Sequence, residues 1–103
     1  MSKFKKHFRR NNSKKVRGHP TYIYKKINDE YYFVGITHAP VTNRVKNIKL
    51  DYNPNPNDSK HSYIRPFSSK EKIKKFSNKE LSDWKINKKD RPKFNRSIKN
   101  FKK

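Results

Sequence analysis

The chain contains no cysteine among its 103 residues, so it has no disulfide bond and no thiolate that could hold a metal ion. Its two glycines, Gly18 and Gly35, are too few for a glycine-rich loop that wraps phosphate groups. Four histidines occur, but none has the spacing of a metal-binding motif. We therefore expect neither a metal ion nor a cofactor.

Long apolar runs are also missing. No stretch approaches the roughly 18 residues that a membrane-spanning helix needs. The basic N-terminus is not followed by the apolar stretch of a secretory signal. Together with the lack of cysteine, these absences favour a cytoplasmic protein. Hydrophobic residues make up 29% of the chain, which leaves room for one small domain.

Acidic residues are scarce. The chain has 29 Lys and Arg against 8 Asp and Glu, a formal net charge of +21 on 12.5 kDa. So large a charge repels itself unless a polyanion is nearby. Nucleic acid is the first candidate, because neutralising phosphates releases condensed counterions. We expect RNA rather than DNA as the partner, with an acidic protein as a further possibility and no membrane.

The excess charge is unevenly distributed. Residues 1–18 carry 8 basic and 0 acidic groups, residues 19–66 carry 7 and 4, and residues 67–103 carry 14 and 4. This pattern predicts a basic flexible arm over 1–18, a small α+β domain over 19–90 and a basic tail over 91–103. Basic side chains from all three segments are candidates for phosphate contacts: Lys5, Lys6, Arg9, Arg10, Lys14, Lys15, Arg17, Arg44, Lys46, Lys49, Lys74 and Lys75.

The densest β-forming sequence lies between Thr21 and Thr37. Residues 21–27 and 30–37 are rich in β-branched and aromatic side chains, and Asn28-Asp29 between them suits a tight turn. The predicted hairpin pairs Tyr24 with Phe33 and Ile23 with Val34.

The remaining segments complete the predicted fold. Residues 41–50 and 61–66 are weaker strand candidates, separated by the proline-rich loop at 53–58, an ordered turn or exposed loop. Ser68 and Glu71 have capping-box spacing, which indicates one or two short helices between 68 and 84. The predicted class is therefore α+β: a small curved antiparallel sheet of three or four strands, one or two short helices, and basic disordered arms.

Four side chains near predicted strand ends are candidates for catalysis: His38, His61, Tyr63 and Arg65. Residues of these types cleave RNA without a metal, because one group takes the 2′-hydroxyl proton, another protonates the leaving 5′-oxygen, and cations stabilise the phosphate. The alternative is structural: His38 ends a strand, Tyr63 packs in the core and Arg65 is a surface charge.

A family resemblance accompanies these residues. The Gly-His-Pro segment at 18–20, the hairpin ending in Gly-Ile-Thr-His at 35–38, the Asn-Pro-Asn loop and the Ser-Tyr-x-Arg segment at 62–65 resemble small metal-independent nuclease domains. These domains belong to the barnase, EndoU, colicin and RelE-like ribonuclease superfamily of toxins and mobile elements. The resemblance covers residues 18–66 and implies a small curved sheet with a ribonuclease site on it.

Two other functions fit the same sequence. A non-catalytic RNA or DNA binder would use the aromatic face of the hairpin (Tyr22, Tyr24, Tyr31 and Phe33) for base stacking or helix packing, and its arms for phosphate. An interaction protein would instead block a nucleic-acid enzyme by binding its acidic or substrate-facing surface. Convergence of the four candidate catalytic residues in one cleft would favour catalysis, and their separation would favour a binder.

Overall fold

The computed structural model of the chain describes residues 4–12 and 18–102. The described residues form eight strands, two short 3-10 helices and one α-helix. In chain order these are β1 (His7–Asn11), β2 (His19–Ile27), β3 (Glu30–Thr37), β4 (Val41–Thr42), β5 (Val45–Lys46), β6 (Ile48–Lys49), β7 (Tyr63–Lys72), η1 (Ile73–Lys75), β8 (Phe76–Glu80), η2 (Lys88–Asp90) and α1 (Arg91–Lys99).

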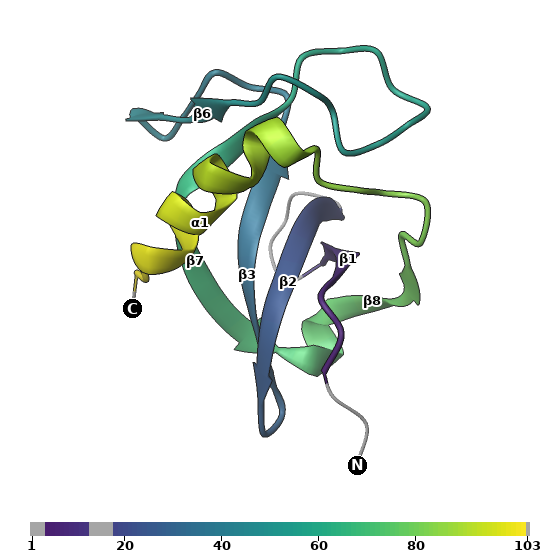
Figure 1. Ribbon diagram of the computed structural model, residues 1–103. Helices are drawn as coiled ribbons and strands as arrows, with labels where there is room; N and C mark the ends of the chain where they lie inside the picture. The colour runs from purple at the N-terminus through teal and green to yellow at the C-terminus, as the bar shows by residue number, and fades with distance from the viewer. Residues whose placement is uncertain (1–3, 13–17, 103) are drawn as a thin grey trace.

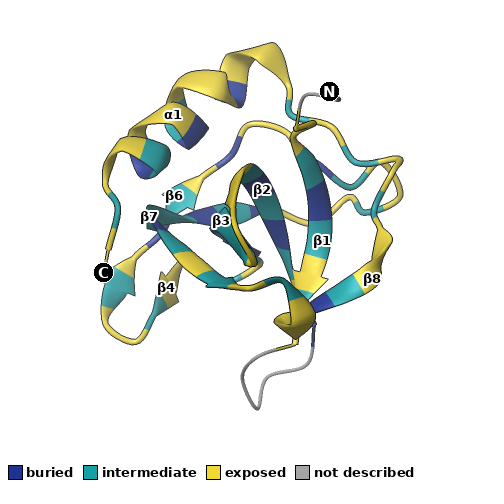
Figure 2. Ribbon diagram, turned by 90° about the horizontal axis from the view of Figure 1, so that it is seen from below, coloured by how far each residue is buried: buried dark blue, intermediate teal, exposed yellow. Residues whose placement is uncertain are grey.

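Six strands form one antiparallel sheet in the order β6-β7-β3-β2-β1-β8, and β4 pairs with β5 in a separate hairpin. Strands β7 and β8 are joined by the three residues of η1, yet three other strands lie between them in the sheet. Four strand spacings span about 19 Å, whereas three residues of 3-10 helix rise only about 6 Å. The sheet must therefore curl to bring these strands together, as Figure 2 shows. The predicted sheet of three or four strands is wrong.

One face of the sheet is covered by α1, which packs on β7 and β3 (Figure 1). The buried cluster includes Phe8, Val34, Ile64 and Phe94. Tyr22 makes an edge contact with Phe94, with 5.3 Å between ring centroids. Through this packing, α1 buries apolar side chains of the β2–β3 hairpin on one face of the sheet.

The opposite face lies inside the curl of the sheet. Ile23 is fully buried there, and the rings of Phe33 and Tyr31 meet the edge of Phe76 at centroid distances of 5.4 and 5.2 Å. Phe76 is the first residue of β8, so these contacts close the curl.

The predicted hairpin register holds only near the turn. Lys25 pairs with Tyr32 and Ile27 with Glu30, as the predicted turn requires, and Asn28 adopts a positive φ of 55°. A bulge between Ile23 and Lys25 then shifts the register by one residue, so that Ile23 pairs with Phe33. An extra residue in one strand leaves no periodic pattern, so the shift was not predictable from alternation.

The expected disorder of the N-terminal arm is wrong for β1. This strand pairs with β2 and β8, and Phe8 packs against Tyr22 and Trp84. The Arg9 guanidinium donates hydrogen bonds to the carbonyls of Ser77 and Asn78. These partners are distant in sequence, so a local count of apolar residues could not detect them. Residues 1–3 and 13–17 of the predicted arm lie outside the described residues.

The predicted helices at 68–84 are replaced by the end of β7, η1 and β8. Ser68 does not cap a helix. Its hydroxyl accepts a hydrogen bond from Tyr24 and donates one to the carbonyl of Ile98, which joins β2, β7 and α1. Sheet pairing with β3 outweighs the local capping-box pattern.

The α-helix lies in the segment predicted as a basic tail. Pro92 lies in the first turn of this helix, where proline is favoured because its missing N–H costs nothing. Phe94 and Ser97 are buried against the sheet, and the Ser97 hydroxyl donates to the carbonyl of Arg65. The cationic residues of α1 lie mostly on its exposed side.

Candidate nucleic-acid interface

Two adjoining hollows lie at the end of β3. The larger is a groove of about 910 Å³ between the β4–β5 hairpin, strands β2, β3 and β7, and the C-terminal segment. The smaller is a pocket of about 260 Å³ beside the 50–62 loop. His19, Ile36 and Thr37 line both hollows, so the two lie next to each other at the ends of β2 and β3.

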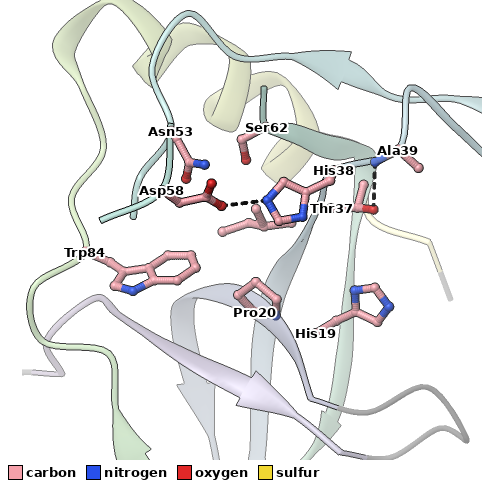
Figure 3. A pocket seen from close by; sticks show the side chains of 10 residues that line it. His19, Pro20, Thr37, His38, Ala39, Asn53, Asp58, Ser62 and Trp84 are labelled. Atoms are coloured by element: carbon pink, nitrogen blue, oxygen red, sulfur yellow. Dashed lines mark hydrogen bonds and ion pairs between the residues drawn. The ribbon is translucent and has the colours of Figure 1, made fainter. Parts of the chain in front are cut away.

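A histidine–carboxylate pair lies in the smaller pocket. His38 Nε2 and Asp58 Oδ2 are 2.7 Å apart, and Figure 3 shows the two side chains pointing toward each other. The backbone N–H of Lys60 and the His38 ring lower the pKa of Asp58, so its carboxylate is charged near neutral pH. A carboxylate accepts, so Nε2 carries the proton and Nδ1 is an acceptor in the neutral ring. The His38 side chain is 58% exposed, so a ligand can reach it.

The 50–62 loop places Asp58 through a series of side-chain turns. Asn53 Oδ1 accepts from the N–H of Asn55, Asn55 Oδ1 from Asn57, and Asp58 Oδ1 from Lys60, at 2.9 to 3.0 Å. Asn and Asp favour this local bonding two residues ahead. The alternating asparagines of the proline-rich segment therefore give an ordered loop.

Arg65 reaches into the larger groove from β7. Its guanidinium donates hydrogen bonds to Asn47 Oδ1 at 2.8 Å and to the Thr42 carbonyl at 3.3 Å, and so supports the β4–β5 hairpin. Phe67, two residues on, also lines the groove. Three cationic side chains and three phenylalanine rings line this groove: Arg65, Lys70, Lys102, Phe33, Phe67 and Phe101.

The four candidate catalytic residues do not gather in one cleft. His38 lines the smaller pocket and Arg65 the larger groove. Tyr63 pairs with Thr37 and Lys49 at the start of β7, and His61 is an exposed residue before that strand. Neither hollow includes His61 or Tyr63 in its lining.

Sequence reasoning missed His19 and Asp58. The position of His19 could have been inferred from the hairpin. Extending the β2–β3 pairing by two residues beyond Thr21 and Gly35 places His19 opposite Thr37, beside His38. Asp58 had none, because its position depends on how the loop folds back. The nearby indole of Trp84 lines the same pocket and contacts Phe8. Figure 3 shows it beside Asp58.

The candidate phosphate-binding cations are spread over the surface. Arg9 and Arg10 hydrogen-bond to backbone carbonyls, Lys14, Lys15 and Arg17 lie outside the described residues, and the others described are exposed. The exposed ones are Lys5 and Lys6 before β1, Arg44 and Lys46 in the β4–β5 hairpin, Lys49 in β6, and Lys74 and Lys75 in η1. The four aromatic residues predicted to form one face for base stacking lie on both faces of the sheet. Tyr22 packs against Phe94 of α1, whereas Tyr31 and Phe33 contact Phe76 on the opposite face.

Most of the few carboxylates are already paired. Four of the eight form ion pairs with lysines among the described residues: Asp29 with Lys72, Glu30 with Lys70, and Asp51 and Asp90 with Lys93. A fifth, Asp58, hydrogen-bonds to His38. Half of the acidic groups are thus balanced by a neighbouring lysine, which leaves the cationic excess to solvent or to a partner.

Within residues 4–12 and 18–102, no group of three His, Asp or Glu side chains is placed to hold a metal ion, and no helix is long and apolar enough to cross a membrane. No protein-family model, curated protein or solved structure matches this chain.

Proposed function

We propose that this protein binds single-stranded RNA, with the groove between the β4–β5 hairpin and β7 as its binding surface. The supporting observation is the lining of that groove, where Arg65, Lys70 and Lys102 lie among phenylalanine rings in a chain of net charge +21. Grooves that bind single strands combine cations for the phosphates with rings for the bases. Thr37, Thr42 and Ser69 also line the groove, and hydroxyl groups of this kind can hydrogen-bond to the ribose 2′-hydroxyl.

Fluorescence anisotropy with the full chain tests this function. A labelled single-stranded RNA of mixed sequence is titrated at low salt in EDTA, alongside DNA of the same sequence and an RNA duplex of equal length. We expect the single-stranded RNA to bind most tightly, with an affinity that falls steeply as salt increases. Failure to bind RNA at low salt, or equal affinity for the duplex, would contradict the proposal.

RNA cleavage in the smaller pocket is a second candidate function, favoured by the His38–Asp58 pair and by His19 in the same lining. In this reaction a neutral histidine takes the 2′-hydroxyl proton, and the 2′-oxygen attacks phosphorus. The bond from phosphorus to the 5′-oxygen breaks, and a protonated histidine gives its proton to that oxygen. The products are a 2′,3′-cyclic phosphate and a 5′-hydroxyl, with no further reactant.

The pocket also predicts which histidines matter. If the protein cleaves RNA, His38→Gln and His19→Gln should each slow cleavage by about 10²–10⁴, the scale for losing a positioned acid or base. His61→Gln is the control, because His61 lines neither hollow. RNA with a single 2′-deoxy position should bind but not be cut there. Cleavage by the His38→Gln/His19→Gln double variant at the wild-type rate would exclude this pocket.

A further inference from the structure

Arg65 is a half-buried cation without a carboxylate partner. Among the described residues it forms no ion pair, and its guanidinium donates to the neutral oxygens of Asn47 and Thr42. Burial lowers the pKa of Arg65, but an arginine keeps its proton at any physiological pH. A partly desolvated positive charge is therefore held in a fixed orientation with no negative charge to balance it.

The backbone beneath Arg65 leaves room for this side chain. Gly35 lies opposite it on β3, and a Cβ at that position would come within 3.1 Å of Arg65 Cγ. One of the two glycines in the chain thus occurs where the arginine crosses the sheet. Gly35 has no positive φ that would require glycine. The reason for glycine at this position is therefore the close approach of the Arg65 side chain.

A second cation lies at the ring of Phe67, which Arg65 also contacts. Arg65 Cζ is 4.8 Å and Lys102 Nζ is 4.7 Å from the centroid of Phe67. Lys102 is held there by its backbone, because its N–H donates to the Ser68 carbonyl and Phe101 forms a bridge with Ser68. Lys102 also forms no ion pair within the described part of the chain.

The acidic residues of the groove lie toward its other end. Glu30 pairs with Lys70 at 3.2 Å, and Glu30 and Glu71 pair across strands with Lys72 and Tyr31, respectively, next to the β2–β3 turn. Arg65 and Phe67 lie toward the opposite end of β7. The unbalanced positive charge of the groove is therefore concentrated at Arg65 and Lys102, on the side that leads to His19 and Thr37.

We propose that Arg65 and Lys102, held over Phe67, form a phosphate-binding subsite that takes one backbone phosphate of single-stranded RNA. This inference rests on the proposed function and assigns a position to one of its contacts. An arginine fork fixed by neutral acceptors binds phosphate oxygens directionally, whereas the lysine adds a point charge. A strand held there continues along the groove past Thr37 toward His38.

The test compares Arg65→Gln and Lys102→Gln with Arg96→Gln and Lys88→Gln, which remove the same charges from exposed positions outside the groove lining. We expect each groove variant to weaken binding of labelled single-stranded RNA about tenfold and to reduce the slope of log affinity against log salt by about 0.7, the value for one phosphate contact on a single strand. The two exposed controls should leave the slope unchanged.

Two further measurements, thermal unfolding and competition by inorganic phosphate, distinguish loss of the subsite from other causes of weaker binding. Arg65→Gln also removes the support of the β4–β5 hairpin, so thermal unfolding is recorded for every variant, and Lys102→Gln tests the site without breaking a described hydrogen bond. Inorganic phosphate should compete only weakly. Competition by free phosphate at the same concentration of phosphate groups would assign the site to a small anion and overturn the proposal.

Two failures can be told apart. If the wild-type chain does not bind RNA at low salt, the proposed function fails and the subsite fails with it. If the wild type binds RNA but the groove variants match the exposed controls, only the subsite is overturned.

Discussion

A few buried polar side chains hold the parts of this small protein together. Asp90 is 1% exposed, and its carboxylate accepts hydrogen bonds from the backbone N–H groups of Asp51 and Tyr52 and from Lys93. It thereby ties the start of the 50–62 loop to the start of α1. Among the described residues, every buried side-chain nitrogen or oxygen has a hydrogen-bond partner.

Replacing Asp90 should therefore lower the free energy of unfolding by more than replacing an exposed aspartate. Asp90→Ala removes a buried acceptor and leaves two backbone donors and one lysine without it, so we expect a loss of about 3–5 kcal/mol in the free energy of unfolding. Urea denaturation measures this loss. The control is Asp83→Ala, because Asp83 is exposed and forms no described ion pair, so its loss should stay below about 0.5 kcal/mol.

The Asp58 carboxylate makes the stability of the folded protein depend on pH in the acid range. The Lys60 N–H and His38 lower the folded-state pKa of Asp58 below its ordinary value of 3.8, so the stabilisation is present above that value and is lost as pH falls through the lower, folded pKa. Melting temperatures between pH 5 and pH 2 should fall less for Asp58→Asn than for the wild type. The effect is small because the site is open to solvent, and a steeper fall for the variant would contradict it.

At the scale of elements, local patterns predicted the hairpin but not its partners. The β-branched runs and the Asn28 turn identify β2 and β3, because those signals lie within a few residues of each other. The identities of β1, β8 and α1 depend on pairing and packing with distant segments. The same limit applies to the site, where His38 was recognised at a strand end and Asp58 was not.

Strand β3 offers a test of the observed packing. Val34 is fully buried under α1, whereas Tyr32 is half-buried, with Lys25 Nζ 4.5 Å and Lys70 Nζ 6.0 Å from its ring centroid. Val34→Asp should unfold the protein, because an unpaired buried charge costs several kcal/mol, on the order of its whole stability. Tyr32→Asp places its carboxylate near two lysines, so this variant should remain folded by circular dichroism. Equal melting temperatures for the two would mean that the difference in burial between these two positions on the same face of β3 is wrongly assigned.

At the scale of the whole molecule, the fold brings the two cationic ends of the sequence onto one sheet. Strand β1 comes from the N-terminal segment, which carries 8 basic and no acidic groups in residues 1–18, and β7, β8 and α1 carry seven of the 14 basic residues between 67 and 103. Composition predicted this charge but placed it on flexible arms. In the structure much of it lies on a folded molecule with principal extents of 35 × 27 × 26 Å, so the charges repel one another in the folded state.

Because of this repulsion, the stability of the folded protein should depend on the salt ions and polyanions in solution. Added salt should raise the melting temperature by screening the repulsion. Single-stranded RNA should raise it further at equal ionic strength, because a ligand at 100 times its Kd adds about 2.7 kcal/mol if it binds only the folded chain. Scanning calorimetry with RNA, with a neutral polymer of equal mass and with the Arg65→Gln/Lys102→Gln variant separates the effects. The neutral polymer should leave the melting temperature nearly unchanged, and the variant should gain less from RNA than the wild type. A melting temperature that falls with added RNA would mean that the polyanion prefers the unfolded chain, and the charge would then not serve binding by this fold.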